Sequence, residues 1–368
     1  MSPSNTAKKK ICIVTSSLGK GGAEKSSAVL SILLDNLGYE VHIISVLNTI
    51  DYNYKGILLN LGALKDKDAS FFGTLKRFNI FFNYLRSHNF DFIIDSRSRP
   101  SILKQFLINK VLYANEKVIF IVHSAFLKNY IPDSKIIASY LYRNAFKFVT
   151  VSKAIKSKLI KKYHFEDVKV IHNAVNEPQI TALTEPLLLP ENFMIFFGRI
   201  EDEVKNLTLL IDSYKQSDLI DNNINLVILG DGADKLKLEQ KVQAMSLTEH
   251  VKFLPYTKNP YPIVRKAMCT VLTSRYEGFP TMLIESLSLG TPVISVNCES
   301  GPSEIILDTH NGLLIDNHNP DLLAEAMNLF VTDTELYNRC KNNAKKSVEK
   351  FSIDTISKDW KRIIEENY

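Results

Sequence analysis

Short apolar runs alternate with longer stretches of helical periodicity along most of the chain. The first cycle comprises an apolar run at residues 11–14, a glycine-rich turn, apolar positions at helical spacing within 23–37, and a second apolar run at 41–46. Continuous apolar runs of this length are typical of parallel strands buried on both faces, and helical spacing between them indicates βαβ units. Similar runs recur at residues 92–94, 118–122, 148–151 and 168–171. The first half is therefore predicted to form a parallel sheet covered by helices.

The same alternation restarts after a break that is rich in proline. Residues 174–192 contain Pro178, Pro186 and Pro190 and show no clear periodicity, which indicates an interdomain linker. Beyond it, strands are predicted at 194–197, 226–229, 251–254, 269–272 and 292–296, and helices at 207–214, 235–245, 261–267 and 281–289. A final amphipathic helix at 353–364 holds Trp360, the only tryptophan, and is expected to cross back to the first domain. We therefore expect an α/β protein with two Rossmann-like domains, residues 1–176 plus 353–368 and residues 177–352.

Charge is distributed unevenly between the two halves. Residues 1–176 hold 26 basic and 12 acidic residues, or +14, whereas residues 177–368 hold 19 basic and 28 acidic residues, or −9. A basic half indicates an anionic partner such as a phospholipid surface, a lipid diphosphate or a nucleic acid, and a solvated basic surface is the alternative. The composition, 45% hydrophobic and 23% charged, is that of a soluble globular protein and argues against a disordered or fibrous chain.

The cysteines and the apolar runs both favour a cytoplasmic protein. Cys12, Cys269, Cys298 and Cys340 lie far apart and give no zinc or redox spacing, so they are expected to be free thiols in a reducing compartment. The apolar run at 11–14 is too short for a signal-peptide core, and no stretch approaches the ~20 apolar residues of a membrane-spanning helix.

One stretch, SRYEGFPTMLIESLSLGTPVIS at residues 274–295, places carboxylates at a strand-to-helix junction. Glu277 and Gly278 lie in the predicted loop, and Pro280 is expected in the first helical turn, where its missing N–H is not needed. Glu285 lies about one turn into the helix, so both glutamates could approach one ligand. Exposed amides and the helix dipole at that end favour phosphate or hydroxyl oxygens. The alternative makes Glu277 a capping group and Glu285 a solvated helix residue.

The two glutamates, in the setting EGFP…E…LGTPVI, resemble the retaining glycosyltransferases of family 4, whose fold is called GT-B. Further matches stand in the family's order: GGAE at 21–24, His123, HNAVN at 172–176, FGRI followed by Lys205, and LGDG at 229–232. The resemblance runs from about residue 10 to the end of the C-terminal helix and is weakest between residues 48 and 91. It implies two parallel sheets that face a central cleft, with the acceptor on the first domain and a nucleotide-sugar donor on the second.

The resemblance also implies roles for individual residues. Glu285 would bind the ribose hydroxyls, Glu277 would lie beside the transferred sugar, and Arg199 and Lys205 would neutralise the donor diphosphate. Fixed cations can stabilise the charge on a leaving phosphate without a metal, and no DxD-type motif stands in a suitable loop, so no metal or other cofactor is expected. The other donor positions are Gly278, Phe279, Pro280, Thr281, Tyr256, Asn173 and Gly22.

His123 and the first glycine-rich turn are the remaining candidates. His123 follows the run at 118–122, at the carboxyl end of a predicted strand, where open α/β sheets bind ligands. A lone histidine is more often structural, but the family match implies a hydrogen bond to a sugar hydroxyl. With Glu277, Arg199 and Lys205, it completes the expected catalytic set. Gly21 and Gly22 with His123 are the acceptor positions. Their turn is not a dinucleotide fingerprint, because Glu24 stands where the third glycine belongs.

The acceptor is expected to be a glycan or a lipid-linked glycan of bacterial surface polysaccharide, lipopolysaccharide or glycoprotein synthesis. Basic amphipathic helices predicted at 101–113 and 152–163 either pack on the sheet or lie on anionic lipid, as a cytoplasmic enzyme on the inner membrane face would need. The donor is expected to be a UDP-linked hexose or N-acetylhexosamine. NCESGPSEII at 297–306 is similar to a branch that uses UDP-galactose or UDP-N-acetylgalactosamine, although Asn297 stands where aspartate is more usual.

Two other functions remain open from the sequence. A UDP-sugar 2-epimerase of the same fold would act without an acceptor, and the EGFP…E loop and GGAE turn argue against it. A non-catalytic scaffold or nucleic-acid protein would use the basic half. The intact donor motifs and the lack of a basic-aromatic motif argue against nucleic acid as a partner.

Overall fold

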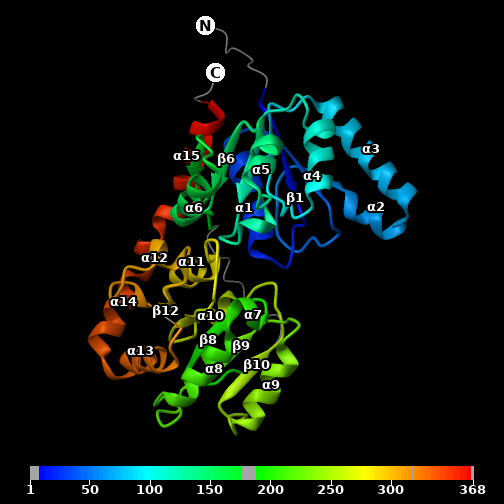
Figure 1. Ribbon diagram of the computed structural model, residues 1–368. Helices are drawn as coiled ribbons and strands as arrows, with labels where there is room; N and C mark the ends of the chain where they lie inside the picture. The colour runs from blue at the N-terminus through cyan, green and yellow to red at the C-terminus, as the bar shows by residue number, and fades with distance from the viewer. Residues whose placement is uncertain (1–7, 176–187, 317, 366–368) are drawn as a thin grey trace. The chain divides into compact units, whose positions relative to one another are not determined.

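The computed structural model describes residues 8–175, 188–316 and 318–365, which fold into two compact units (Figure 1). Unit 1 comprises Met1–Ala174 together with Ile353–Tyr368, and unit 2 comprises Val175–Ser352. Each unit is built on one parallel sheet with helices around it. The predicted fold class, two Rossmann-like domains in an α/β protein, is confirmed.

Unit 1 contains a seven-stranded sheet in the order β3-β2-β1-β4-β5-β6-β7, and all its strand pairs are parallel. The strands are β1 (Lys10–Thr15), β2 (Glu40–Ser45), β3 (Ile57–Asn60), β4 (Phe92–Asp95), β5 (Val118–Val122), β6 (Lys147–Thr150) and β7 (Val168–Val170). The strand order reverses between β1 and β4. The carboxyl ends of strands at such a switch point are where open α/β sheets bind ligands.

The helices of unit 1 follow the connections between these strands. They are α1 (Gly22–Asn36), α2 (Leu61–Lys67), α3 (Phe71–His88), α4 (Ile102–Leu107), the π-helical turn η1 (Ile108–Leu112), the 3-10 turn η2 (Leu127–Asn129), α5 (Lys135–Tyr142), α6 (Lys153–Tyr163) and α15 (Ile353–Glu365). The last helix, α15, packs against α1 and buries Trp360. The Lys9 ammonium donates to the Ile364 carbonyl at 3.0 Å, and the Tyr39 hydroxyl donates to Glu365 at 3.0 Å. The predicted return of the C-terminal helix to the first unit is confirmed.

Unit 2 contains a six-stranded parallel sheet in the order β10-β9-β8-β11-β12-β13. Its strands are β8 (Phe193–Phe197), β9 (Asn225–Leu229), β10 (Val251–Leu254), β11 (Thr270–Leu272), β12 (Val293–Val296) and β13 (Gly312–Ile315). Its helices are α7 (Asp202–Lys205), α8 (Leu207–Gln216), α9 (Lys235–Ala244), α10 (Tyr261–Val264), α11 (Thr281–Ser288), α12 (Pro302–Ile305), α13 (Pro320–Thr332), α14 (Thr334–Ser347) and the 3-10 turn η3 (Glu349–Phe351). Here the order reverses between β8 and β11.

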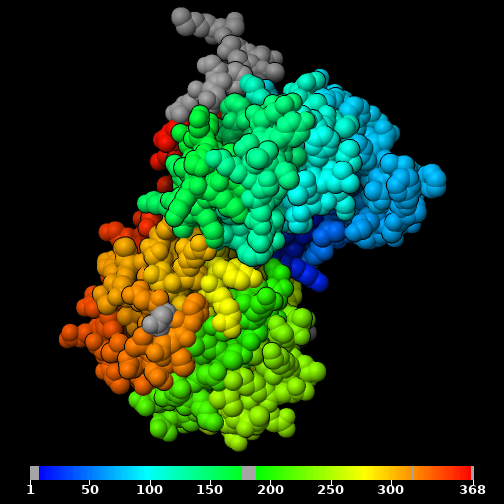
Figure 2. All heavy atoms as spheres, in the orientation of Figure 1, coloured from blue at the N-terminus to red at the C-terminus, as the bar shows by residue number. Residues whose placement is uncertain are grey.

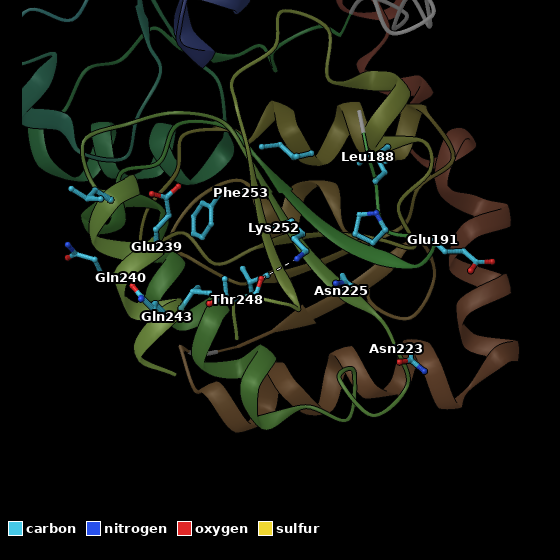
Figure 3. Close-up of a pocket in the computed structure, with 16 residues that line it drawn as sticks. Leu188, Glu191, Asn223, Asn225, Glu239, Gln240, Gln243, Thr248, Lys252 and Phe253 are labelled. Carbon is cyan, nitrogen blue, oxygen red and sulfur yellow. Dashed lines mark hydrogen bonds between the residues drawn. The ribbon is translucent and has the colours of Figure 1, made fainter. Parts of the chain in front are cut away.

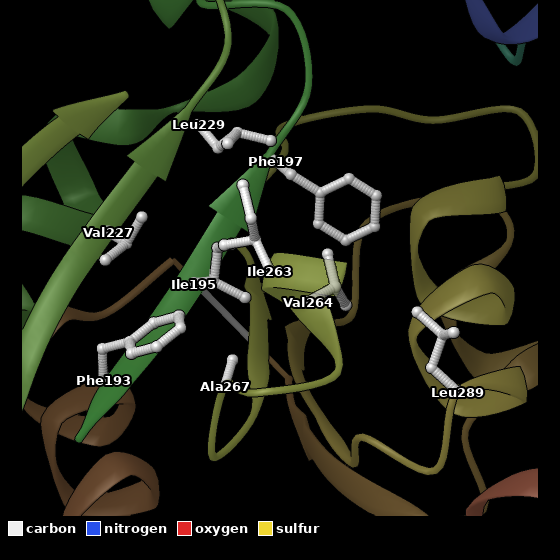
Figure 4. Close-up of a cluster of buried hydrophobic side chains, with 9 residues drawn as sticks. All are labelled: Phe193, Ile195, Phe197, Val227, Leu229, Ile263, Val264, Ala267 and Leu289. Carbon is white, nitrogen blue, oxygen red and sulfur yellow. The ribbon is translucent and has the colours of Figure 1, made fainter. Parts of the chain in front are cut away.

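One face of the central strands in unit 2 forms a compact apolar cluster. Phe193, Ile195 and Phe197 alternate along β8 and meet Ile263 and Val264 of α10 (Figure 4). The other members are Val227, Leu229, Ala267 and Leu289. Close packing of this cluster against one face of β8 holds the strand rigid, so the loop after Phe197 starts from a fixed point.

The structure also contains elements that the apolar pattern did not predict. The edge strands β3 and β13 contain apolar runs of three residues, 57–59 and 313–315, that were not predicted as strands, and both runs are only partly buried. Helices α2 and α3 lie in the stretch 48–91, where the family resemblance is weakest, and α13 and α14 follow β13. The predicted helix at 261–267 is only one turn long and ends at Val264.

Candidate active site

Apart from Tyr256, the candidate residues of unit 2 lie on two connections that leave the neighbouring strands β8 and β11. One connection contains α7, which ends at Lys205, and the other is the loop 273–280 that leads into α11. Two hydrogen bonds join them. The Thr273 hydroxyl donates to the Lys205 carbonyl at 2.8 Å, and the Arg275 amide donates to the Val204 carbonyl at 2.9 Å. The end of α7 is thereby fixed against the glutamate loop.

Lys205 and Glu277 form the central ion pair of this site. The Lys205 ammonium donates to Glu277 Oε1 at 2.6 Å, and the Ser274 hydroxyl donates to the same oxygen at 2.7 Å. The Lys205 and Glu277 side chains are 23% and 12% exposed, so the pair is shielded from water yet reachable by a ligand. Both contacts fall on Oε1, and within the described residues Oε2 of Glu277 makes no hydrogen bond, so it has the capacity to accept from a ligand hydroxyl. We call Lys205, Ser274 and Glu277 the clamp.

The backbone around α7 explains why Lys205 is aimed at the loop. Asn206 adopts a left-handed conformation with φ of 51°, which ends α7 immediately after Lys205 and starts α8 in a new direction. The Asp202 carboxylate accepts from the amide and the hydroxyl of Thr208, both at 2.7 Å, and so ties α7 to the first turn of α8. This short, braced helix holds Lys205 at the carboxyl end of β8.

Arg199 lies on the same connection but outside the clamp. Its side chain is 54% exposed, and its guanidinium pairs with Glu201 at 3.2 Å. An exposed pair of this kind contributes little to stability and leaves the arginine able to change partners. The sequence grouped Arg199 with Lys205, whereas the structure joins only Lys205 to the glutamate loop.

Glu285 is buried in α11. Its side chain is 4% exposed, so the alternative of a solvated helix residue is wrong. We expected Pro280 in the first turn of the helix, but α11 begins at Thr281 and Pro280 stands just before it. Pro280 provides no side-chain cap for the first amides of α11. Glu277 and Glu285 therefore flank a helix start whose amides have no side-chain acceptor at the cap position.

A second stretch braces this loop from behind. The Ser300 hydroxyl donates to the Gly278 carbonyl at 2.7 Å. Gly301 has φ of 100°, and a Cβ there would lie 2.4 Å from Cδ of Pro280. The positions 278–281, expected around the donor, thus depend on a glycine twenty residues further on. Sequence reasoning missed Ser274, Ser300 and Gly301 as supports, although NCESGPSEII contains two of them.

In unit 1, His123 ends a chain of hydrogen bonds across three strand ends. Nε2 of His123 lies 2.7 Å from the Ser96 hydroxyl, which lies 2.7 Å from the Ser27 hydroxyl. Thr15 at the end of β1 donates to Ser27 at 3.2 Å. We call Thr15, Ser27 and Ser96 the hydroxyl chain. It holds the imidazole ring in one orientation at the switch point of the sheet.

The other ring nitrogen of His123 has no such support. Nδ1 is buried and makes no hydrogen bond within the described residues. Burial, together with the nearby Arg99 guanidinium, lowers the pKa of His123 to about 3, so the ring is neutral at physiological pH. The ring is therefore a neutral imidazole whose Nε2 is hydrogen-bonded to Ser96.

A buried charge cluster lies beside this histidine. Asp95, at the end of β4, is fully buried and accepts two hydrogen bonds from the Arg97 guanidinium, at 3.0 and 2.6 Å, and one from the Tyr113 hydroxyl at 3.2 Å. Arg99, also buried, lies 3.6 Å from the same carboxylate and donates to the Ile121 carbonyl at 3.1 Å. The two arginines hold the pKa of Asp95 below its usual value despite burial. One positive charge in excess therefore remains near His123.

The other candidates of unit 1 are more loosely connected. The Asn173 amide oxygen accepts from Ser26 of α1 at 2.7 Å. Asn173 and His123 both line a small cavity of about 20 Å³ between α1, β5 and α15. Gly21 precedes α1 without a side-chain cap, and a Cβ on Gly22 would meet no atom within 4 Å. Gly22 therefore occupies an open position that a ligand could approach.

A much larger cavity lies away from these residues. It measures about 960 Å³ and lies in unit 2 along α9 and the edge strand β10 (Figure 3). Polar side chains such as Gln240, Gln243 and Lys252 and apolar ones such as Leu188 and Phe253 line it. None of the predicted site residues does, and Tyr256, expected near the base, lies just beyond the end of β10. The candidate site is therefore identified by its charged and polar side chains and not by the volume of a cavity.

Three further observations concern metals, cysteines and membranes. Among the described residues, no group of three or more His, Cys, Asp or Glu side chains is arranged to hold a metal ion. All four cysteines are buried and unpaired, as expected from their spacing. Within the described ranges, every helix is too short or too polar to cross a bilayer.

Comparisons with known protein families divide the chain as the structure does. A family model described as Glycosyltransferase Family 4 matches residues 20–178, and one described as Glycosyl transferases group 1 matches residues 184–347. The first match lies almost entirely in unit 1 and the second lies in unit 2.

Relatives and solved structures extend this likeness over nearly the whole chain. The chain is 28% identical over 363 residues to the Campylobacter jejuni N-acetylgalactosamine-N,N'-diacetylbacillosaminyl-diphospho-undecaprenol 4-alpha-N-acetylgalactosaminyltransferase, covering 95% of this chain and 98% of that protein. A mutant of S. aureus TarM, solved in complex with Fondaparinux, alpha-GlcNAc-glycerol and UDP, aligns with a TM-score of 0.75 at 15% identity over 97% of this chain and 100% of that one. Anabaena Alr3699/HepE, in complex with UDP and glucose, aligns with a TM-score of 0.76 at 18% identity, again over 97% and 100%.

Proposed function

The chain belongs to the GT-B glycosyltransferases of the family 4 type, and from this premise we propose that it is a retaining enzyme that uses a UDP-sugar. The sugar is a hexose or N-acetylhexosamine, and the acceptor is a glycan or lipid-linked glycan of bacterial surface polysaccharide, lipopolysaccharide or glycoprotein synthesis. The name of the Campylobacter relative, which includes a diphospho-undecaprenol, supports the lipid-linked acceptor. The UDP in the TarM and Alr3699/HepE complexes supports the nucleotide.

The clamp is the observation that carries the proposal. When UDP leaves, negative charge develops on its β-phosphate, and a fixed cation stabilises that charge without reorganisation. Lys205 is such a cation, because Glu277 and the end of α7 hold it in place. Arg199, exposed and paired only with Glu201, is the second cation of the proposal and moves to the diphosphate when the donor binds.

The two carboxylates have separate tasks in this proposal. Glu277 accepts a hydroxyl of the transferred sugar through Oε2, while Oε1 stays with Lys205 and Ser274. Glu285, buried in α11, accepts the ribose hydroxyls of UDP. The acceptor oxygen bonds to the anomeric carbon on the face from which UDP departs, the bond from that carbon to UDP breaks, and the hydroxyl proton passes to the departing phosphate oxygen, so the anomeric configuration is retained. No side chain is assigned as a covalent nucleophile.

The test is a transfer assay with the full chain. Purified enzyme is incubated with a panel of UDP-sugars and an undecaprenyl-diphosphate-linked glycan, UDP release is measured, and the new linkage is assigned by NMR coupling constants. We expect UDP release that depends on the acceptor and an α-linkage from a UDP-α-sugar. A β-linkage would overturn retention. Conversion of UDP-N-acetylglucosamine without an acceptor would identify an epimerase instead.

Two control experiments sharpen this assay. EDTA should leave the rate unchanged, because Lys205 and Arg199 are proposed to supply the positive charge, whereas restoration of an EDTA-inhibited rate by a divalent metal would overturn metal independence. In a thermal-shift screen of nucleotides, UDP should raise the melting temperature by more than ADP, GDP or CDP does. Retardation of RNA or DNA at physiological salt without any nucleotide shift would favour the nucleic-acid alternative.

A further inference from the structure

Glu201 stands between the two cations of the proposed donor site and pairs with one of them. The connection that leaves β8 carries Arg199, Glu201 and Lys205 in that order. The Arg199 guanidinium donates to Glu201 Oε1 at 3.2 Å, whereas Lys205 is held by Glu277. Glu201 is the N-cap residue of α7, yet its side chain accepts no hydrogen bond from the amides of that helix. Its carboxylate therefore serves Arg199 and not the helix.

The backbone places these two side chains together. The Glu201 amide donates to the Arg199 carbonyl at 3.2 Å, which closes a three-residue turn. Ile200, at the centre of the turn, is fully buried, and its amide donates to the Asp231 carbonyl at 2.9 Å. The turn is thereby anchored to the residue that follows β9, and the side chains on either side of Ile200 stand next to each other at the surface. The pairing therefore follows from the turn as well as from the side-chain rotamers.

Carboxylates outnumber cations on the two connections that form the proposed donor site. Figure 2 shows unit 2 with all its atoms, green near residue 200 and yellow near residue 275, where hydrogen bonds join the two connections. Together, residues 199–205 and 273–280 hold four acids and three bases, which are Glu201, Asp202, Glu203 and Glu277 against Arg199, Lys205 and Arg275. Burial and the charges of three of these acids, Glu203, Glu201 and Glu277, raise the pKa of Tyr276, so the three carboxylates lie around one phenol. An anionic diphosphate is therefore repelled as well as attracted here.

The pair of Arg199 and Glu201 is one that a diphosphate can replace. Both side chains are exposed, and an exposed ion pair contributes little free energy. A phosphate group accepts two parallel hydrogen bonds from a guanidinium, which is a stronger interaction than the single bond to Glu201. The carboxylate and the phosphate compete for the same N–H donors. Binding of the donor therefore breaks the pair, and departure of UDP restores it.

We propose that Glu201 is a positioning residue that holds Arg199 until the diphosphate of the donor displaces it. In the free protein, the carboxylate occupies the guanidinium and competes with UDP for it. The pair thereby lowers the affinity for UDP and favours release of this product after transfer. The inference rests on the proposed role of Arg199 as the second cation of the donor site, and it assigns Glu201 a task that the proposed function does not include.

The test is isothermal titration calorimetry of the full chain with UDP. Glu201→Gln removes the negative charge and keeps the size of the side chain, so Arg199 loses its competing partner. This variant should bind UDP about threefold more tightly than wild type, because an exposed ion pair is worth no more than a few-fold in affinity. Damage to the fold would weaken binding, so tighter binding is a result that a merely structural role does not produce. Unchanged affinity overturns the proposal, and weaker binding would show that Glu201 aims Arg199 at the phosphates instead.

Two further variants separate competition for Arg199 from general repulsion of the diphosphate. Glu203→Gln removes an exposed carboxylate of the same helix that forms no ion pair within the described residues, so it measures repulsion alone. Its gain in UDP affinity should be smaller than that of Glu201→Gln and should fade at high salt. In the Arg199→Met background, Glu201→Gln should gain no more than Glu203→Gln does, because no guanidinium is left to release. An equal gain from Glu201→Gln with and without Arg199 overturns the proposal.

The same titrations separate this inference from the proposed function. Arg199→Met alone should weaken UDP binding, because it removes a cation from the diphosphate. If it leaves the UDP affinity unchanged, the donor role of Arg199 fails and the inference fails with it. If Arg199→Met weakens UDP binding while Glu201→Gln has no effect, the donor role stands and only the inference fails. Absence of UDP binding by wild type overturns the choice of nucleotide and this inference together.

Discussion

The two units use the same architecture but place different chemistry at the carboxyl ends of their strands. In unit 2, the charged pair within the clamp, Lys205 and Glu277, is partly exposed, and Arg199 on the same connection as Lys205 is more than half exposed. In unit 1, His123 is buried and neutral, and hydroxyl groups rather than ions position it. The charged groups of unit 1 near His123 are buried, as in the ion pair of Asp95 and Arg97.

Under the proposed function, this difference suits the same architecture to two binding tasks. A diphosphate carries full negative charge, and partly exposed cations bind it without the cost of being buried in the free protein. A sugar is neutral and is recognised by hydrogen bonds whose geometry must be fixed in advance. The charged edge of unit 2 fits the first task and the neutral edge of unit 1 fits the second.

Breaking the clamp should have the largest effect on activity. Lys205→Ala removes the fixed cation at the proposed leaving group, and the loss of one preorganised stabilising group typically lowers kcat by ~10²–10³-fold. The measurement is the initial rate of acceptor-dependent UDP release at saturating donor. Lys241→Ala breaks a pair with Asp212 at 2.7 Å on the surface of the same unit and should change the rate by less than about twofold. A Lys205→Ala rate within threefold of wild type contradicts the role of the clamp.

Glu285→Gln should have the next largest effect, and on binding rather than on the chemical step. Hydrogen bonds to a charged group contribute ~1.5–3 kcal/mol each, so loss of the charge should weaken UDP affinity by about tenfold or more. Isothermal titration calorimetry with UDP measures it, and Glu239→Gln on α9 is the matched control. Glutamine keeps the volume of the buried side chain, so the fold is retained. Unchanged UDP affinity would remove the ribose role from Glu285.

The sequence predicted unit 2 better than unit 1. Glu277, Gly278 and Pro280 are neighbours in the chain, so a local motif already places them together, and Lys205 follows an adjacent strand end. The hydroxyl chain could not be predicted in the same way. Thr15, Ser27 and Ser96 are small polar residues on separate elements, and no periodicity or spacing distinguishes them from other serines and threonines. Their meeting depends on the strand order, which brings β4 beside β1.

Arg199 and the basic helices show a second limit. The family resemblance grouped Arg199 with Lys205, but the left-handed turn at Asn206 and the bonds to the loop 273–277 select Lys205 alone. Likewise, α4 and α6 have similar patterns of lysine and apolar residues, and only packing shows which stripe is covered. Periodicity identifies an apolar stripe but not the surface that covers it.

The burial of neutral His123 makes a prediction about pH and stability. The pKa of His123 is about 3 in the fold, against 6.5 for an ordinary histidine, so between these values the unfolded chain binds a proton that the folded chain excludes. The stability that neutral His123 allows is complete above pH 6.5 and is lost progressively as the pH falls toward 3. At pH 5, the loss should be about 2 kcal/mol.

Urea unfolding of the full chain at pH 7.5 and at pH 5.0 measures this effect. The difference between the two pH values should be smaller in His123→Gln than in wild type by about 2 kcal/mol, because glutamine does not titrate. His310→Gln, at an exposed histidine of unit 2, should leave the difference unchanged. An equal pH difference in wild type and His123→Gln would mean that folding does not lower the pKa of His123, and the contrast between the two edges would disappear.

Removal of one hydroxyl group from the hydroxyl chain should have the smallest effect on the protein and is the finest test of the contrast between the two edges. Ser96→Ala leaves Nε2 of His123 and the Ser27 hydroxyl without the group that joins them, and a buried polar group that loses its partner costs ~1–3 kcal/mol. Ser213→Ala is the matched control, since the Ser213 hydroxyl is buried but makes no hydrogen bond within the described residues. It should be neutral or slightly stabilising. If the two variants lose the same stability, the hydroxyl chain does not hold His123 in place, and the neutral edge of unit 1 is shaped by packing alone.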